Sequence, residues 1–289
     1  MLSLMGKVAL VTGASRGVGK GIALGLGEAG ARVYLTGRSL EWGRLEENLP
    51  GTIFETAAEV TRLGGTGIPL ACDHRQDSQV EAVFERIMRE QGRIDILVNN
   101  AWGGYEYLDG LDGEFTWFNA FWEQPVWRWD AMFQGGVRAA FVASALAART
   151  MVAQHSGLIV NISYWAGRTY MNNVMYGVAK AAVDRLVADM AYELQEHQVA
   201  VLALYPGLVR TERVLRNAQY FDMSNSESPQ FTGRAVAALA ADPEVMTKSG
   251  QALVAAALAL EYGFKDIDGK QPRPLTLQDV IASGSKGEQ

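Results

Sequence analysis

The chain has 289 residues, a formal net charge of -6 and a pI of about 5.2. This mildly acidic balance argues against a nucleic-acid partner, which would require a basic surface. Cys72 is the only cysteine, so no internal disulfide can form, and the three scattered histidines have no partners at metal-ligand spacing. The composition therefore predicts a protein with a large apolar core and with no metal site.

The N-terminal residues run almost directly into an apolar strand, without the basic and apolar regions of a secretory signal. The longest apolar run, 252–260, is too short to cross a bilayer and predicts a buried strand. We expect a soluble, cytoplasmic protein with no transmembrane segment. Association with one membrane face through an apolar patch stays open at this point.

Strand-like apolar runs alternate with helical patterns along the chain, which is typical of a parallel sheet with helices on both faces. We expect strands at 8–12, 32–36, 68–72, 94–98, 158–162, 199–204 and 253–258. We expect helices at 17–30, 53–63, 78–91, 129–152, 174–197 and near 233–240. No repeat and no shift in composition marks a boundary, so residues 1–289 are predicted to form a single domain.

Three segments interrupt this alternation: 39–52, an aromatic insertion near 102–128, and a polar, lid-like segment near 208–230. Five of the seven tryptophans lie at the aromatic insertion, namely Trp102, Trp117, Trp122, Trp127 and Trp129. A long loop this aromatic is a packed flap, a subunit contact or a wall of a substrate pocket. We expect packing for most of these rings, with Trp102 and also Trp165 as candidate substrate contacts.

A glycine-rich turn, Thr12 to Gly19, follows the first predicted strand and precedes the first predicted helix. Gly13 would make the turn, while Gly17 and Gly19 would leave room for a pyrophosphate at the N-terminus of the helix. Such glycines also serve plain strand–helix packing, so the spacing alone is a weak signal. Its place in the alternating pattern favours nucleotide binding.

The second predicted strand ends in Thr36-Gly37-Arg38 and carries no carboxylate for an adenosine 2′-hydroxyl. Arg38, and Arg16 in the glycine-rich turn, can instead offer guanidinium donors to a 2′-phosphate. Either arginine alone could be a solvated surface charge. Together with the missing acid, the two arginines predict NADP(H) as the cofactor.

Tyr176 and Lys180 lie one turn apart on the helix predicted at 174–197, and Ser163 follows the strand predicted at 158–162. An ammonium beside a phenol favours the phenolate, which would make Tyr176 a general acid or base near neutral pH. The Ser163 hydroxyl could hold a carbonyl oxygen. Combined with a nucleotide-binding turn, these residues indicate a nicotinamide oxidoreductase.

The chain resembles the short-chain dehydrogenase/reductases in the order and spacing of Thr12-Gly-x-x-x-Gly-x-Gly19, Asn99-Asn100-Ala101, Ser163, Tyr176-x-x-x-Lys180 and Pro206-Gly207. Within that superfamily it is similar to the branch named dehydrogenase/reductase member 1, through Ala120-Phe-Trp-Glu-x-Pro125 and Tyr262-Gly-x-x-Asp-x-Asp-Gly269. The resemblance implies a Rossmann-like doubly wound parallel sheet with strand order 3-2-1-4-5-6-7 and helices on both faces. It also implies a homodimer or homotetramer that packs the two long helices together.

The resemblance further implies a role for each matching residue. Tyr176 would be the acid/base, Lys180 would lower its pKa and bind the nicotinamide ribose, and Ser163 would orient the carbonyl. The remaining cofactor contacts would be Gly13, Ser15, Arg16, Gly17, Val18 and Gly19 for the phosphates, Arg38 for the 2′-phosphate, Asp73 for adenine, Asn99 and Ala101 on the cofactor side, and Pro206, Val209 and Thr211 over the nicotinamide.

Two positions depart from the family pattern. Most members have glycine where this chain has Trp102, and many carry an asparagine where it has Gly136, preceded by Gly135. Two glycines inside a helix cost about 1 kcal/mol each relative to alanine, so they indicate a kink, a bulge or close packing. We keep all three alternatives, and Gly136 is not counted as catalytic.

We expect an enzyme that interconverts carbonyl and alcohol groups on apolar small molecules, with steroid and xenobiotic carbonyls among the candidates, because the aromatic insertion indicates an apolar pocket. Two alternatives stay open. One is an enoyl or imine reductase, or a dehydratase, on the same scaffold. The other is a weakly catalytic NADP(H)-binding sensor or scaffold protein.

Overall fold

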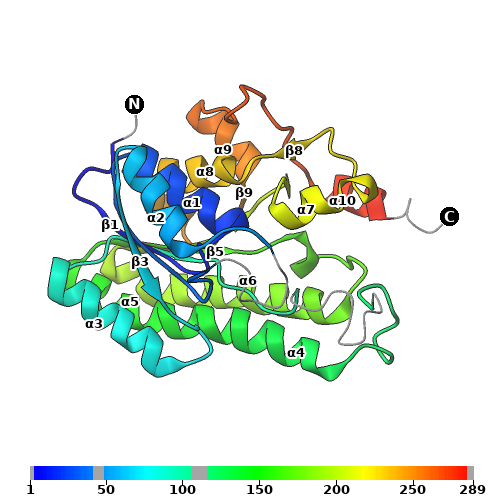
Figure 1. Cartoon of the computed structure of the whole chain (residues 1–289), viewed down its shortest axis with the longest axis horizontal. Helices are drawn as coiled ribbons and strands as arrows, with labels where there is room; N and C mark the ends of the chain where they lie inside the picture. The colour runs from blue at the N-terminus through cyan, green and yellow to red at the C-terminus, as the bar shows by residue number, and fades with distance from the viewer. Residues whose placement is uncertain (1–2, 42–48, 106–115, 285–289) are drawn as a thin grey trace.

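The computed structural model describes residues 3–41, 49–105 and 116–284, so the middle parts of the 39–52 connection and of the aromatic insertion lie outside the described residues. A parallel sheet of seven strands runs through the molecule in the order β3-β2-β1-β4-β5-β6-β9 (Figure 1). The predicted order 3-2-1-4-5-6-7 is confirmed, since β9 is the seventh strand of this sheet along the chain. The strands are β1 (Val8–Val11), β2 (Arg32–Gly37), β3 (Thr66–Ala71), β4 (Ile96–Asn99), β5 (Gly157–Ile162), β6 (Val199–Tyr205) and β9 (Ala252–Val254).

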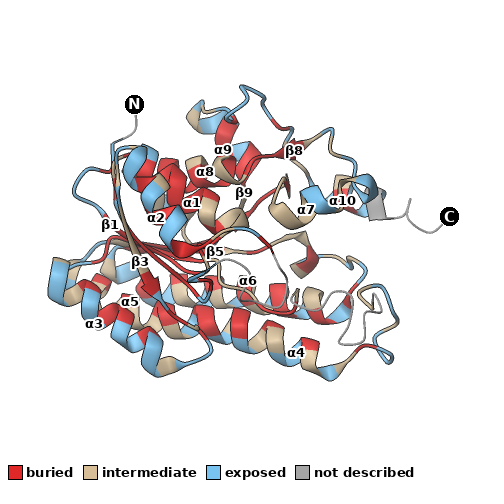
Figure 2. Cartoon of the chain, viewed as in Figure 1, coloured by how far each residue is buried: buried red, intermediate tan, exposed pale blue. Residues whose placement is uncertain are grey.

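Helices cover both faces of the sheet, because its apolar strands need a partner on each side (Figure 1). Leu26, Val236 and Leu258 belong to the core on one face, and Val83 and Val187 to the core on the other. Figure 2 shows the sheet buried between these layers. The first face carries α1 (Gly17–Glu28), α2 (Ile53–Arg62), α8 (Pro229–Ala241) and α9 (Ala255–Tyr262); the second carries α3 (Asp77–Gln91), α5 (Ala139–Gln154) and α6 (Val174–Leu194).

The long helix before β5 is continuous from Val126 to Gln154, although its middle changes geometry. It begins as α4 (Val126–Met132), passes through the π-helical turn η1 (Phe133–Arg138) and continues as α5. Gly135 and Gly136 both lie in η1. Single π-helical turns of this kind often occur at functional sites. Of the three alternatives for these glycines, the structure shows a bulge together with close packing, since a Cβ at Gly136 would lie 2.6 Å from carbons of the Trp102 ring.

By length and composition alone, the helix Val126–Gln154 could also cross a membrane. Core helices of sheet proteins meet the same criteria. Ala143, Ala147 and Met151 of this helix are fully buried in the core on one face of the sheet. We therefore interpret the segment as a core helix.

The prediction of a strand at 253–258 is wrong in extent. β9 ends at Val254, and the alanine-rich residues that follow form α9. Alanine and leucine favour the helix, so local propensity ends the strand early.

The lid-like segment contains elements that the sequence pattern did not reveal. β7 (Leu208–Val209) and β8 (Ser226–Glu227) pair in a separate small sheet, with α7 (Glu212–Arg216) between them. The short pairing and the polar composition of this segment explain why no period is visible in its sequence. The remaining short helices are η2 (Trp165–Gly167), η3 (Gln195–His197), η4 (Ala218–Tyr220), η5 (Val245–Lys248) and α10 (Leu277–Gly284).

Helices α1 and α8 approach each other closely through glycines. A Cβ at Gly25 would lie 2.4 Å from the carbonyl carbon of Gly233, whereas one at Gly27 would lie 3.0 Å from a side-chain methyl and 3.1 Å from the carbonyl oxygen of Val60. The contact at Gly25 is the shorter one, so Gly25→Ala should lower the free energy of unfolding by about 1–3 kcal/mol despite alanine's better helix propensity. Gly27→Ala, in the same helix, should cost less. Urea unfolding measures both, and equal stabilities would contradict this account of the α1–α8 contact.

Candidate active site

Ser163, Tyr176 and Lys180 come together at the carboxyl end of β5. Lys180 is buried, and its Nζ donates to the carbonyl oxygen of Ile162, the last residue of β5, at 3.1 Å. Ser163 follows directly, and its hydroxyl hydrogen-bonds to the Asp184 carboxylate and lies 3.5 Å from the main-chain oxygen of Lys180. Tyr176 lies one turn earlier on α6, with its ring centroid 5.7 Å from Lys180 Nζ. A hydroxyl, a phenol and a cation thus share one site.

An aromatic cluster, defined here as Trp102, Tyr105 and Trp117, surrounds the Tyr176 ring. The three ring centroids lie 5.8, 6.1 and 5.6 Å from that of Tyr176, respectively. The Tyr176 hydroxyl hydrogen-bonds to Tyr105. Of the predicted tryptophans of the insertion, Trp122 lies apart from this cluster at 74% exposure, and Trp129 stacks on Phe133.

Burial in this cluster raises the pKa of Tyr176 well above its usual value, and the neighbouring Tyr105 and Tyr164 reinforce the shift. Burial also lowers the pKa of Lys180 to about 7. The expected lowering of the Tyr176 pKa by Lys180 is therefore not observed. The physical reason is that burial removes the water that would stabilise the phenolate. The Lys180 ammonium does not compensate for this loss, because it lies against the ring of Trp102.

Asn173 holds the aromatic insertion to α6, and Arg128 braces the insertion internally. Asn173 caps α6 by accepting from the Tyr176 main-chain N–H at 3.0 Å, and its amide donates to the Trp117 carbonyl oxygen at 3.0 Å. Arg128 is fully buried, donates to Thr116, and lies over the Trp117 ring at 5.5 Å. These residues carry no recognisable motif, so the sequence analysis did not find them.

The glycine-rich turn has the open backbone that a pyrophosphate needs. Gly13 and Gly17 adopt φ angles of +66° and +57°, a region that favours glycine. A Cβ at Gly19 would lie 2.3 Å from the Gly13 carbonyl oxygen. Ser15 is buried and Val18 half-buried in the same turn.

The turn is tied to the end of β4 by Asn100 rather than by Asn99. The Asn100 amide donates to the Gly13 carbonyl oxygen at 2.9 Å, and the Ala101 N–H donates to the Thr12 hydroxyl at 2.9 Å. The Asn99 side chain instead faces the core, donating to Ser144 at 2.8 Å. Asn99 could reach a cofactor only through its backbone, and Ala101 lies beside the turn as predicted.

An anion already lies at the start of α1. The Gly17 N–H donates to the Glu212 carboxylate at 2.9 Å, and Glu212 begins α7 in the lid-like segment. A carboxylate in this position stands in for a phosphate oxygen, since helix N-termini attract both. Together with the glycine backbone, this contact shows that the turn fits a dinucleotide pyrophosphate.

The residues predicted for the adenosine end lie close together. Arg38 is exposed at the end of β2, and its charge helps to lower the pKa of Asp73. Burial works against that lowering, but hydrogen bonds from Arg75 outweigh it. Arg16 donates to Ser39 at 3.0 Å and to the Gly51 carbonyl oxygen at 3.1 Å, so it also braces the connection after β2.

Pro206, Val209 and Thr211 lie in the segment that follows β6. Pro206 and Val209 are buried, and the Thr211 hydroxyl caps α7 by accepting from the Val214 N–H at 3.3 Å. Glu227 is fully buried beneath this segment, where burial raises its pKa to about 7. Glu227 was not identified from the sequence, because a lone acid in a polar stretch carries no signal.

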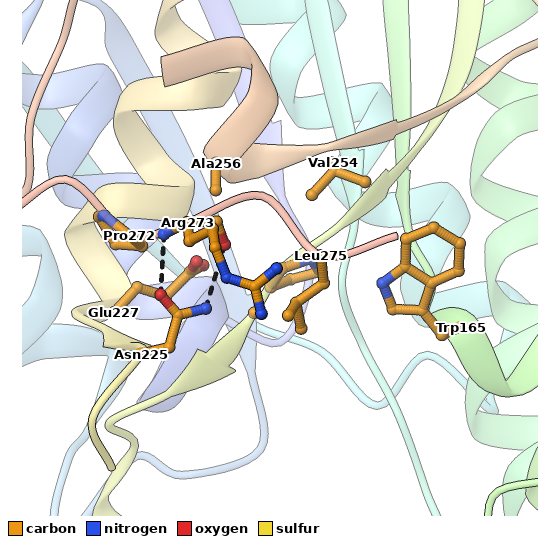
Figure 3. Close-up of a pocket in the computed structure, with 10 residues that line it drawn as sticks. Trp165, Asn225, Glu227, Val254, Ala256, Pro272, Arg273 and Leu275 are labelled. Atoms are coloured by element: carbon orange, nitrogen blue, oxygen red, sulfur yellow. Dashed lines mark hydrogen bonds between the residues drawn. The ribbon is translucent and has the colours of Figure 1, made fainter. Parts of the chain in front are cut away.

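Trp165 lies in a different place from the aromatic cluster. Its ring packs edge-on against Tyr205 at 5.2 Å. It lines the pocket in Figure 3 together with Pro206, Glu227 and Leu275. The two tryptophans proposed as substrate contacts are therefore not neighbours, and only Trp102 contacts the ring of Tyr176.

A doubly wound parallel sheet with an open glycine turn and a Ser–Tyr–Lys group at its carboxyl edge defines a nucleotide-dependent oxidoreductase. The family model described as short chain dehydrogenase matches residues 7–219. The chain belongs to this family and is an oxidoreductase enzyme.

The similarity extends over most of the chain. Dehydrogenase/reductase SDR family member 1 of Mus musculus is 44% identical over 281 residues, which span 92% of this chain and 85% of that protein. The Homo sapiens protein of the same name is 40% identical over 292 residues, 96% of this chain and 88% of that protein. The predicted resemblance to this branch is confirmed.

Solved structures share the fold. A short chain dehydrogenase from Mycobacterium thermoresistibile has a TM-score of 0.77 at 27% identity, covering 95% of this chain and 94% of that chain. A metagenomic short-chain oxidoreductase in complex with NADP has a TM-score of 0.67 at 29% identity, covering 87% of this chain and 96% of that chain.

Proposed function

We propose that the protein is an NADP(H)-dependent oxidoreductase that interconverts carbonyl and alcohol groups on apolar small molecules. The observation that carries this proposal is the meeting of Tyr176, Lys180 and the Ser163 hydroxyl beside a cluster of aromatic rings. Such rings supply an apolar surface for substrates, including steroid and xenobiotic carbonyls.

In the proposed reduction, Ser163 donates a hydrogen bond to the substrate carbonyl oxygen and fixes its orientation. Tyr176 gives its phenolic proton to that oxygen, and its raised pKa keeps the phenol protonated at neutral pH. The Lys180 ammonium stabilises the negative charge that remains on the phenolic oxygen. When bound, the nicotinamide supplies the hydride for the carbonyl carbon.

The proposal of NADP(H) rests on Arg38, on the absence of an acid at the end of β2, and on a solved relative that carries NADP in its complex. Arg38→Ala should weaken NADPH binding about 10- to 100-fold and leave NADH binding nearly unchanged, because it removes charge-assisted hydrogen bonds to the 2′-phosphate. Fluorescence titration with both nucleotides measures this.

Arg62→Ala is the control for Arg38→Ala, since it removes the same charge from an exposed position in the last turn of α2. Introducing an acid at Gly37 would be a poorer test than Arg38→Ala, because the Cβ of the new side chain would lie 2.8 Å from a methyl carbon of Ile53. A wild-type preference for NADH would refute the proposed role of Arg38.

An enoyl or imine reductase, and a weakly catalytic NADP(H) sensor, are the competing functions. Incubation of the protein and NADPH with an aromatic ketone, the matching enone and a cyclic imine separates them by product analysis. Alcohol from the ketone is the expected product. Saturated ketone or amine alone would favour the first alternative, and tight NADPH binding without turnover would favour the sensor.

We also propose a cytoplasmic homodimer or homotetramer that packs α5 and α6 of neighbouring copies. Phe141 on α5 is 52% exposed, and Val178 and Tyr192 on α6 are 42% and 83% exposed, which supports an apolar contact surface there. Light scattering after size exclusion tests the oligomer, and a monomer at micromolar concentration would exclude it.

A further inference from the structure

The Trp102 ring lies directly against the Lys180 ammonium. Lys180 Nζ is 3.7 Å from the centroid of that ring, closer than its 5.7 Å from the ring of Tyr176. Lys180 is 5% exposed, so water contributes little to stabilising its charge. A cation on an indole face is held by the ring quadrupole, most strongly when the site is dry.

Gly136 leaves the space that the Trp102 ring occupies. A Cβ at Gly136 would lie 2.6 Å from two carbons of the indole, Cε3 and Cζ3. Any side chain at this position would therefore push the ring away from Lys180. The π-helical turn η1 places this glycine beside the ring.

The backbone of Trp102 cannot retreat to relieve such a clash. The preceding residue, Ala101, is bound to Thr12. On the other side, a Cβ at Gly103 would lie 2.3 Å from the Ala131 carbonyl oxygen, so the chain there already touches α4. Lys180, Trp102 and Gly136 therefore form one contiguous unit.

We propose that Trp102 is a positioning residue that holds the Lys180 ammonium through its indole face, and that Gly136 is required to admit the ring. The inference deepens the proposed function, on which the catalytic role of Lys180 rests.

The charged and titratable groups facing Lys180 are few. Asp184 lies one turn further on α6 and favours the ammonium, and Tyr176 lies one turn earlier with its phenol protonated. From the loop after β4, Tyr105 joins Trp102, and its own pKa is raised to about 12 by burial. Loss of the Trp102 ring face therefore removes an interaction that favours the ammonium and leaves the opposing effect of burial.

The test is the pKa of Lys180 itself, measured by NMR titration of lysine-labelled, cofactor-free protein with Lys180→Met as the assignment control. The starting value is about 7. Trp102→Leu keeps an apolar side chain but no ring, and should lower the Lys180 pKa by about one unit. Trp102→Phe keeps a ring face and should lower it less. In kinetics, the alkaline limb of the kcat/KM profile should move to lower pH in the same order.

Gly136→Ala should reproduce the effect of Trp102→Leu by displacing the ring. In the Trp102→Leu background it should add little, because the ring is already gone. Gly135→Ala is the matched control in the same π-helical turn, since the three atoms nearest to its Cβ would all be backbone atoms, the closest at 3.3 Å in Gly103. It should leave the Lys180 pKa unchanged.

Additive effects of Gly136→Ala and Trp102→Leu would overturn the proposal. So would a Trp102→Leu protein that loses thermal stability but keeps the Lys180 pKa, because that result assigns the ring to packing alone. The NMR titration needs neither substrate nor cofactor. A protein inactive on every carbonyl tested would refute the proposed function. The NMR titration would still decide this inference independently.

Discussion

Tyr176→Phe should lose most carbonyl reduction, on the order of the 10²–10⁴-fold that positioned acid–base groups contribute, and should still bind NADPH. The phenylalanine ring keeps the contacts with the aromatic cluster, so the fold around it should persist. Only the hydroxyl proton is removed. Steady-state kinetics on a ketone, paired with NADPH titration, measures both effects.

The control for this loss is Tyr192→Phe, which removes a hydroxyl from the same helix at a position that is 83% exposed in the single chain and keeps the ring for the proposed contact between copies. It should match the wild type. Near-normal ketone reduction by Tyr176→Phe would refute the acid role. Loss of NADPH binding would indicate instead that the phenol serves the cofactor site.

Lys180→Met should reduce turnover by about 10² and weaken NADPH binding about tenfold, because it removes a buried cation from both the phenol and the ribose side of the site. Lys180→Arg keeps the charge and should retain more of both. Kinetics and titration as for Tyr176 measure the two losses separately, and unchanged NADPH affinity in Lys180→Met would limit Lys180 to the chemical step.

The pH dependence follows from the same lysine. With its pKa lowered by burial to about 7, the ammonium is present below that pH and is lost as pH rises through it. Reduction should therefore decline above neutral pH, and Lys180→Arg should carry the decline to higher pH. A wild-type profile that is flat from pH 6 to 9 would contradict a catalytic ammonium.

The sequence predicted the sheet well because buried parallel strands leave long apolar runs that are separated by helices. The glycine-rich turn and the Tyr176–Lys180 pair were visible because each is a local spacing. Asn173 and Glu212 were missed because the partners Trp117 and Gly17 lie far away along the chain.

The Tyr176 pKa was mispredicted for a related reason. Its neighbour on the helix was known from spacing, but its burial depends on rings that come from the loop after β4. Long-range burial of this kind has no period in the sequence. The prediction of a strand at 253–258 was wrong in extent for a local reason, because a short apolar run does not distinguish a strand from a helix.

Through the hydrogen bond from the Gly17 N–H to Glu212, the lid-like segment competes with a nucleotide for the start of α1. A pyrophosphate oxygen and this carboxylate cannot accept from the same N–H, and their charges repel each other. If the pyrophosphate accepts from the Gly17 N–H, as the glycine-rich turn predicts, its binding would release Glu212, the first residue of α7. The apparent affinity for the dinucleotide would then be lowered by the free energy of that release, as for any ligand that binds only one of two states. An uncharged side chain at position 212 would raise affinity without touching the nucleotide.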